Sequence, residues 1–236
     1  MPLFMSNPVA IITGAARGIG RAIAAELKRA GHDVVLVART KSDLDEAASA
    51  IGGGVIVPAD VTKPADVDAI VAQALGRFSR IDVLVNNAGL APVVSVKEMS
   101  IDRWRAVLDT NLSAAFYLSR ACWPTFEKQG GGVIVNISSV ASRDPFPGFA
   151  AYGAAKAGLN LFGLALAREG EPIGVRVHTI APGSVETAMF RKLMSPQQWP
   201  TERTLDPSEV ARLVVQCVSG DLRHTSGEVI FLHKTL

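Results

Sequence analysis

The chain has few of the residues and segments that mark several large classes of protein. Its 236 residues include only two cysteines, its net charge is +2, and charged residues make up 19% of the composition. No run of five like charges occurs, which argues against a nucleic-acid groove or a surface for anionic membranes. No apolar stretch approaches the length of a membrane span. The sequence therefore indicates a globular protein whose partners are small molecules.

The two cysteines, Cys122 and Cys217, lie in apolar helical patterns without C-x-x-C or metal-ligand spacing. This pattern predicts two buried free thiols in a reducing compartment, and no metal site. The opening stretch, Met1 to Pro8, lacks the basic and apolar regions of a signal peptide. We therefore expect a cytoplasmic protein.

Apolar residues, at 48% of the chain, are abundant and fall into short strand-like runs that alternate with helical patterns. The expected strands are 9–13, 34–38, 55–58, 81–85, 133–137, 175–180 and 228–232. The expected helices run from the first glycine turn to about Arg29, over 42–51, 66–78, 96–109 and 112–128, and onward from about Ala150 and from Pro207. Such alternation predicts an α/β fold, a doubly wound parallel sheet of about seven strands covered by helices on both faces. No linker or composition shift divides it, so we expect one domain over 1–236.

A glycine-rich turn follows the first strand and opens the first helix. Gly14 permits a tight turn, Gly18 lets the backbone approach a ligand, and Gly20 allows close helix-strand packing. Strand, glycine turn and helix together place backbone N–H groups against a phosphate. A glycine turn can also be a plain loop, but its place after the first strand favours a dinucleotide site. Asp60 and Asn87 end two further strands at the edge where such ligands bind.

A second chemical pattern lies between Ser138-Ser139, which end an apolar strand, and Lys156. Tyr152 and Lys156 are four residues apart on a helix and share one face. An ammonium near a phenol favours the phenolate and lowers the phenol's pKa, so Tyr152 can exchange a proton with an alcohol or carbonyl oxygen. A strand-end serine can hydrogen-bond the same oxygen. Many solvated helices carry this spacing, so the surrounding motifs decide its meaning.

Taken together, the motifs resemble the short-chain dehydrogenase/reductase family, in its branch of about 250 residues. The resemblance covers nearly the whole chain and rests on six features in the family's order: T-G-x-x-x-G-x-G at 13–20, N-N-A-G at 86–89, Asn111, I-S-S ending at Ser139, Y-x-x-x-K at 152–156, and P-G-x-V-x-T at 182–187. It implies a three-layer Rossmann-like domain that binds a nicotinamide dinucleotide and catalyses hydride transfer.

The resemblance also implies a role for each catalytic residue. Tyr152 is the general acid/base, and Lys156 lowers the pKa of Tyr152 and binds the nicotinamide ribose. Ser139, thirteen residues before Tyr152, is preferred to Ser138 as the hydroxyl that binds the reacting oxygen. Asn111 holds a water in a proton relay toward Lys156, although taken alone it could equally cap the helix that follows it. Thr187 and the backbone of Val185 orient the nicotinamide, and the other expected cofactor contacts are Ile19, Val61, Ala88, Gly89, Pro182 and Gly183.

The expected cofactor is NADP(H). Members that bind NAD carry an acidic residue at the end of the second strand, whereas this chain has Ala38 followed by Arg39. Arg17, in the glycine turn, is the second place where NADP-preferring relatives carry a basic residue. Two guanidinium groups that converge on a 2′-phosphate would make charge-assisted contacts; solvated surface arginines would not contribute.

The substrate-facing segments are expected at 90–94, at 140–149 and in a lid at 188–204. Their apolar residues favour an apolar or aromatic carbonyl compound, or else they pack the lid or a subunit contact: Phe146, Phe149, Met189, Phe190, Leu193, Met194 and Trp199. Arg143 and Arg191 are either binding groups for an acidic substrate or solvated loop residues.

Within the family, the chain looks most like a 3-oxoacyl-acyl-carrier-protein reductase. Two departures weaken this resemblance: Ile173 stands where the carrier-docking reductases have a basic residue, and the terminal V-D-G-G is missing. A general carbonyl or diketone reductase is the alternative. The motifs are also compatible with an alcohol dehydrogenase working oxidatively and, more distantly, with a non-catalytic dinucleotide sensor. His178 has no functional interpretation.

The helix that contains Tyr152 is apolar nearly all round, so a face beyond the sheet needs a second cover. In the family this cover is another subunit, which predicts a homotetramer or homodimer.

Overall fold

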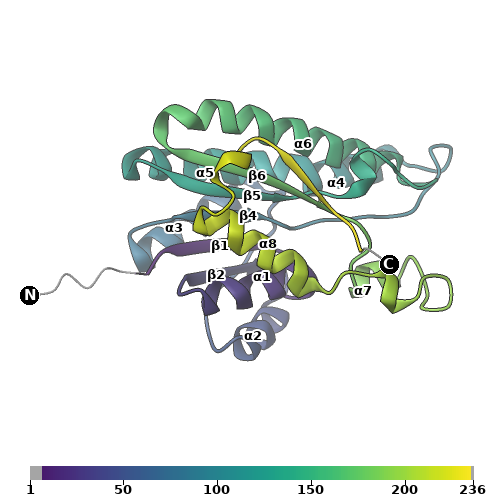
Figure 1. The fold of residues 1–236 in the computed structure, drawn as a ribbon, viewed down its shortest axis with the longest axis horizontal. Coiled ribbons are helices and arrows are strands. Elements are labelled where there is room, and N and C mark those ends of the chain that lie inside the picture. The colour runs from purple at the N-terminus through teal and green to yellow at the C-terminus, as the bar shows by residue number, and fades with distance from the viewer. Residues whose placement is uncertain (1–6, 235–236) are drawn as a thin grey trace, which may run out of the picture.

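A computed structural model describes residues 7–234, which form a seven-stranded parallel sheet (Figure 1). Residues 1–6, most of the opening stretch in which we expect no targeting signal, lie outside the described residues, as do 235–236. The strand order is β3-β2-β1-β4-β5-β6-β7. The strands are β1 (Val9–Thr13), β2 (Asp33–Ala38), β3 (Val55–Pro58), β4 (Val83–Asn86), β5 (Gly132–Ile137), β6 (Val175–Pro182) and β7 (Val229–Leu232). The predicted fold class, a doubly wound Rossmann-like sheet, is confirmed.

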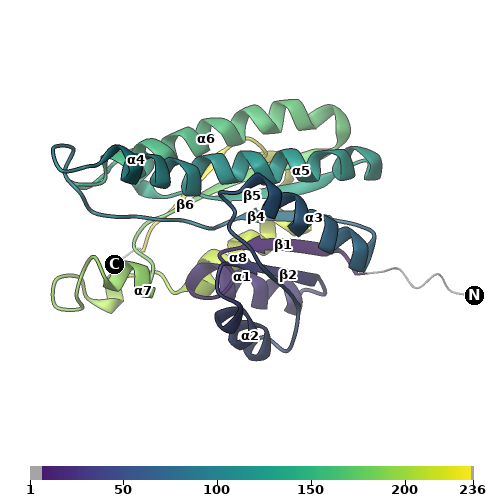
Figure 2. The same ribbon diagram turned by 180° about the vertical axis from the view of Figure 1, so that it is seen from behind.

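Helices cover both faces of this sheet, as Figures 1 and 2 show from opposite sides. One face carries α3 (Pro64–Phe78), α5 (Ala114–Gln129) and α6 (Ala150–Gly170), and the other carries α1 (Gly18–Arg29), α2 (Lys41–Ala50) and α8 (Pro207–Ser219). Two short helices, α4 (Ile101–Leu108) and α7 (Ala188–Arg191), lie at the same end of the molecule on opposite sides of the sheet (Figures 1 and 2). None of the helices among residues 7–234 is long and apolar enough to cross a membrane.

The two cores follow from the alternation of side chains along each strand. In β1, Val9 and Ile11 pack toward α3 and α5, whereas Ala10 and Ile12 pack toward α1 and α8. Both faces are apolar because both are covered, which explains why the strands read as continuous apolar runs.

Two boundaries differ from the sequence prediction. The helix expected from residue 96 begins only at Ile101, because Ser100 caps it by accepting a hydrogen bond from the backbone N–H of Arg103. The predicted break near 110–111 is instead a π-helical turn, Asp109–Ser113, through which the helix continues into α5. A π-turn keeps helical backbone angles, so a pattern of apolar residues cannot separate it from a break.

Both cysteines are buried, as predicted, and burial raises the pKa of each thiol to about 12. Cys217 lies on α8 beneath β6, where its carbonyl accepts a hydrogen bond from Arg176. The thiols are therefore packing groups of the core.

His178, on β6, is fully buried, and burial together with the neighbouring charge of Arg176 lowers its pKa to about 4. Its Nδ1 lies 3.2 Å from the Thr225 hydroxyl, while its Nε2 has no partner among the described residues. The folded protein thus holds this imidazole neutral.

Acid is expected to destabilise the fold through His178. The unfolded chain binds a proton near pH 6.5 and the folded chain only near pH 4, so the stability present above pH 6.5 is lost as pH falls toward 4. The free energy of unfolding should drop by about 2 kcal/mol between pH 7 and pH 5 from this group alone. Urea titrations of the wild type and of His178→Asn at both pH values measure this drop in the free energy of unfolding. An equal loss in the variant would show that other groups are responsible.

Candidate active site

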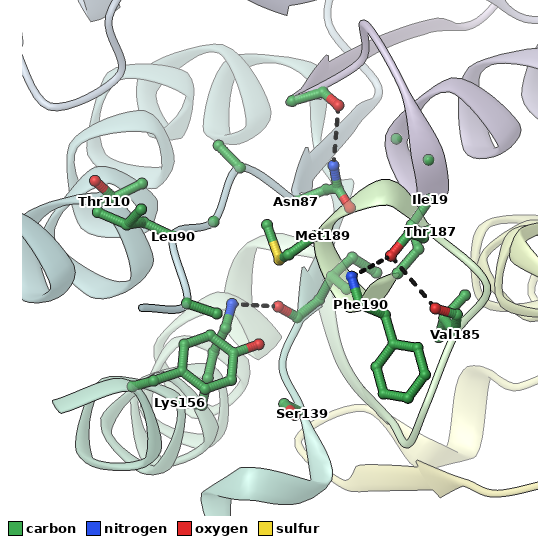
Figure 3. A pocket seen from close by; sticks show the side chains of 18 of the residues that line it. Ile19, Asn87, Leu90, Thr110, Ser139, Lys156, Val185, Thr187, Met189 and Phe190 are labelled. Atoms are coloured by element: carbon green, nitrogen blue, oxygen red, sulfur yellow. Dashed lines mark hydrogen bonds between the residues drawn. The ribbon is translucent and has the colours of Figure 1, made fainter. Parts of the chain in front are cut away.

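A cavity of about 830 Å³ opens at the carboxyl ends of the strands. It is lined by the glycine turn, by the ends of β2 to β6, by the start of α6 and by the segment around α7 (Figure 3). Between β3 and β4 the chain crosses to the other side of β1, so the segments that follow the paired strands β1 and β4 leave on opposite faces of the sheet and a crevice for a ligand forms between them.

The glycine turn is shaped for close approach by a ligand. Gly14 has a φ of +65°, and a Cβ added to Gly20 would lie 2.2 Å from the Gly14 carbonyl oxygen. Helix α1 then starts at Gly18 without a side-chain cap, so its first N–H groups are free to receive an anion. These residues fit the pyrophosphate of a dinucleotide, as predicted.

Asn87 joins this turn to the end of β4. Its Nδ2 donates to the carbonyl oxygens of Thr13 at 2.8 Å and of Gly14 at 3.3 Å. The Thr13 hydroxyl in turn accepts from the backbone N–H groups of Asn87 and Ala88. Asn87 therefore holds the turn open while its own side chain lines the cavity.

The part of the cavity beyond β2 and β3 carries the two predicted arginines. Arg17 and Arg39 are exposed, line the cavity and form no ion pair within residues 7–234. Asp60 also lines it; burial raises the pKa of this carboxyl, but two hydrogen bonds from Thr62 outweigh burial and lower the pKa overall. The region thus combines two arginines that form no ion pair with one ionised carboxylate, whose pKa the nearby charge of Arg39 also lowers.

At the other end of the cavity lie Tyr152, Lys156 and Ser139. Lys156 is buried, and its Nζ donates to the carbonyl oxygen of Ile137 at 2.8 Å (Figure 3) and lies 5.7 Å from the centre of the Tyr152 ring. Ser139 lines the cavity beside Tyr152 and acts to lower the pKa of its hydroxyl. The three residues come from β5, the loop that follows it and α6, as the sequence spacing predicts.

The expected lowering of the pKa of Tyr152 is wrong for this geometry. Burial raises the pKa of Tyr152, and the hydrogen bond with Ser139 offsets burial only in part. Burial also lowers the pKa of Lys156 to about 7, so this amine is only partly charged at neutral pH and its hydrogen bond is given to a backbone carbonyl. In this state Tyr152 is a neutral phenol, a proton donor.

The two serines of the strand end are used differently. Ser138 is buried, and its hydroxyl donates to Asn160 at 2.6 Å. Ser139 accepts a hydrogen bond from the N–H of Ala141 and faces the cavity beside Tyr152. The structure therefore places Ser139, and not Ser138, in contact with the phenol.

Asn111 is the one predicted catalytic or cofactor residue that does not line the main cavity. It caps no helix: its Nδ2 donates to the carbonyl oxygens of Leu90 at 2.8 Å and Val107 at 2.9 Å, and its Oδ1 accepts from the Leu90 N–H. It lies behind Gly89, where an added Cβ would be 3.1 Å from Asn111 Oδ1 and 4.0 Å from Lys156 Nζ. Asn111 thus fixes the segment after β4 opposite Lys156.

The remaining predicted residues all line the main cavity: Ile19, Val61, Ala88, Gly89, Pro182, Gly183, Val185 and Thr187.

The substrate side of the cavity is largely apolar. Phe146, Phe149, Met189, Phe190, Leu193 and Met194 line it, as predicted, whereas Trp199 packs against Phe190 outside it. Neither arginine proposed for an acidic substrate is available. Arg143 stacks on Phe231 with its guanidinium carbon 3.9 Å from the ring centre, and Arg191 is ion-paired with Glu186.

One wall of the cavity was missed by the sequence prediction. Asp102, Arg105, Ala106 and Asp109, on one face of α4 and the π-turn, also line the cavity. Their helical spacing was visible, but polar residues on a helix face usually indicate a solvated surface. Only the folded structure shows that this helix face forms a wall of the cavity.

Comparison with known proteins agrees with this geometry. The profile of the short chain dehydrogenase family matches residues 8–198. The chain is 35% identical over 234 residues to the 3-oxoacyl-[acyl-carrier-protein] reductase of Salmonella typhimurium, covering 95% of each chain. It is 39% identical over 215 residues to the corresponding reductase of Synechocystis, covering 88% of this chain and 87% of that one. The crystal structure of a 3-ketoacyl-(acyl-carrier-protein) reductase from Brucella melitensis, complexed with NADH, superposes with a TM-score of 0.90 at 29% identity and covers 98% of both chains. The chain therefore belongs to the short-chain dehydrogenase family and is an oxidoreductase.

Proposed function

We propose that the protein reduces a ketone to an alcohol with NADPH, in the manner of a 3-oxoacyl-acyl-carrier-protein reductase. The observation that supports this best is the neutral Tyr152 phenol, which lines, together with Ser139 and Lys156, a cavity that fits a dinucleotide. A phenol whose pKa is raised stays protonated at neutral pH, which is the form that ketone reduction requires, whereas alcohol oxidation requires the phenolate.

In this reaction the nicotinamide supplies the hydride. Tyr152 donates its proton to the substrate oxygen, and Ser139 hydrogen-bonds the same oxygen as negative charge develops there. Lys156, when charged, stabilises the phenolate that remains and binds the nicotinamide ribose. Asn111 and Lys156 both lie close to Gly89, and a water held between them would return a proton. Thr187 and the backbone of Val185 orient the nicotinamide.

The preference for NADPH rests on Arg17 and Arg39. Both line the cavity without an ion pair in the described part of the chain, and Ala38 ends β2 where an acidic residue would accept ribose hydroxyl hydrogen bonds. The Brucella relative was crystallised with NADH, so it is these two side chains, and not the fold, that support NADP(H) here.

The second candidate is a general carbonyl or diketone reductase. Ile173 packs partly buried against the core at the position where carrier-docking relatives are basic, and the substrate side of the cavity is apolar. Both features suit a free apolar ketone better than a group carried by an acidic protein.

We also propose that the protein is a homotetramer or homodimer. On α5 and α6, Phe116 and Leu161 remain 47% and 67% exposed, and Phe116 meets Phe162 edge to face. A second copy would cover this apolar face.

A substrate panel with NADPH tests the function. We expect turnover of β-ketoacyl thioesters, with kcat/KM at least about tenfold above aryl ketones, diketones and quinones. The reverse order would establish the second candidate. Failure of every compound on the panel to oxidise NADPH would contradict both.

A further inference from the structure

Within residues 186–204, one side chain, Arg191, donates hydrogen bonds to several parts of the segment. Its Nε donates to Glu186 Oε1 at 2.7 Å, and its Nη2 donates to the other carboxylate oxygen and to the Thr201 hydroxyl at 3.2 Å. Its Nη1 donates to the carbonyl oxygens of Trp199 at 2.7 Å and Met194 at 3.4 Å. A guanidinium has five N–H donors, and here all five have an acceptor within the same segment. We call this arrangement the Arg191 clasp.

Glu186 ties the far end of the segment into the clasp. Its Oε2 accepts from the hydroxyl of the buried Thr204 at 3.0 Å, and its backbone N–H donates to the carbonyl of Leu205 at 2.9 Å. The hydrogen bonds from Arg191, the largest cause, lower the pKa of Glu186, so the carboxylate is ionised. The side chains of Arg191 and Glu186 are only 17% and 33% exposed, which strengthens the pair relative to a surface ion pair.

The segment has no other polar attachment. Within residues 7–234, the hydrogen bonds of 188–204 all end on residues 186–204. The Phe190 and Trp199 rings meet edge to face at 6.5 Å inside the same unit. The clasp therefore joins the locally hydrogen-bonded turns at 187–194, 195–199 and 200–204 into one unit.

The clasp begins one residue before a cofactor contact and ends beside the substrate. Thr187 follows Glu186 directly; its hydroxyl donates to the Val185 carbonyl at 3.3 Å and accepts from the Phe190 N–H at 3.2 Å, as Figure 3 shows. Met189 and Phe190, on α7, line the cavity (Figure 3). Leu193 and Met194, just after α7, line it as well.

We propose that Arg191, through Glu186, is a positioning residue that sets the lid of this active site. The clasp makes 186–204 one body, so that Thr187 and the apolar lid residues reach nicotinamide and substrate together. For its effect on catalysis the inference rests on the proposed reductase function; for its effect on the lid it does not. It also explains why Arg191 does not serve as a binding group for an acidic substrate.

Arg191→Met removes all five donors while keeping a long apolar stem. Lys192→Met is the matched control, because Lys192 is the next residue, is exposed, has no side-chain hydrogen bond or ion pair in the described chain, and carries the same charge. Chymotrypsin cleaves after Phe190 and, more slowly, after Leu193 and Met194, and both variants retain these three residues. Trp199 precedes Pro200 and is not a cleavage site. We expect cleavage within 188–204, identified by fragment mass, to be at least about tenfold faster in Arg191→Met and unchanged in the control.

The kinetic readout separates positioning from a purely structural role. In Arg191→Met, KM for the ketone should rise at least about tenfold while the dissociation constant for NADPH stays within about threefold, because the adenosine contacts are untouched. Arg191→Lys should restore little, since one ammonium cannot reproduce the planar fork.

Glu186→Gln is a second test of the clasp, which remains informative if Arg191→Met misfolds. It should raise the cleavage rate less than Arg191→Met does, and the double variant should be cleaved no faster than Arg191→Met alone. Cleavage of Arg191→Met at the control rate would overturn the clasp. Faster cleavage with an unchanged KM would overturn the positioning role. Because cleavage needs no substrate, the clasp can be tested even if the proposed function is wrong, and a wrong function would itself show as no ketone turnover by the wild type.

Discussion

Replacing Tyr152 with phenylalanine is expected to lower kcat by about 10³-fold, the scale of a lost general acid. The hydroxyl is the only group removed, and the ring keeps its packing against Phe149, whose centre lies 5.4 Å away. Folding and NADPH binding should therefore be almost unchanged. Single-turnover oxidation of NADPH gives the rate, and fluorescence titration gives the affinity.

The chain offers a matched control, because Tyr117 is its only other tyrosine. Tyr117 lies on α5 beside Phe116 and does not line the cavity. Tyr117→Phe should retain wild-type turnover. If Tyr152→Phe kept more than about a tenth of the wild-type rate, another group would have to supply the proton.

Replacing Arg39 with aspartate is expected to change the ratio of kcat/KM for NADPH to that for NADH by at least about 100-fold. A charge-assisted hydrogen bond contributes about 1.5–3 kcal/mol, and each 1.4 kcal/mol is about a factor of ten. Aspartate also repels a 2′-phosphate and accepts hydrogen bonds from the ribose hydroxyls of NADH. Steady-state kinetics with both cofactors and one ketone measure the ratio.

Lys41→Asp makes the same change of charge two residues away. Lys41 is exposed, pairs with Asp45 at 2.8 Å and does not line the cavity. It should alter the ratio by less than about threefold, as expected for a screened surface charge. Equal shifts in the two variants, or a wild type that already favours NADH, would contradict the assignment of Arg39.

Much of the site could be predicted because its residues are fixed by local rules. Gly14 and Gly20 are required where a side chain would collide with the backbone or with Asn87. Tyr152 and Lys156 share a helix face by spacing alone. The fold followed in the same way, because strands buried on both faces and separated by helices form a parallel sheet.

What could not be predicted depends on long-range contacts. The pKa of Tyr152 is set by how deeply the ring is buried, which no spacing reveals. The two hydrogen bonds between Asn111 and Leu90 depend on the π-turn and on the path after β4. The sequence suggested only that Arg191 is a charged loop residue. The fold shows that its guanidinium is ion-paired with Glu186 and donates to the backbone carbonyl of Trp199. Trp199 likewise turned away from the cavity to pack on Phe190.

The central claim is that a partly buried, neutral phenol stands beside the reacting carbon at the carboxyl edge of the sheet. A crystal structure of the protein with NADPH tests it most directly. We expect the nicotinamide ring against Thr187, the Tyr152 hydroxyl directed at the face of the ring where substrate binds, and the 2′-phosphate against Arg39. A Tyr152 hydroxyl directed away from the ring, or a dinucleotide bound elsewhere, would contradict the claim.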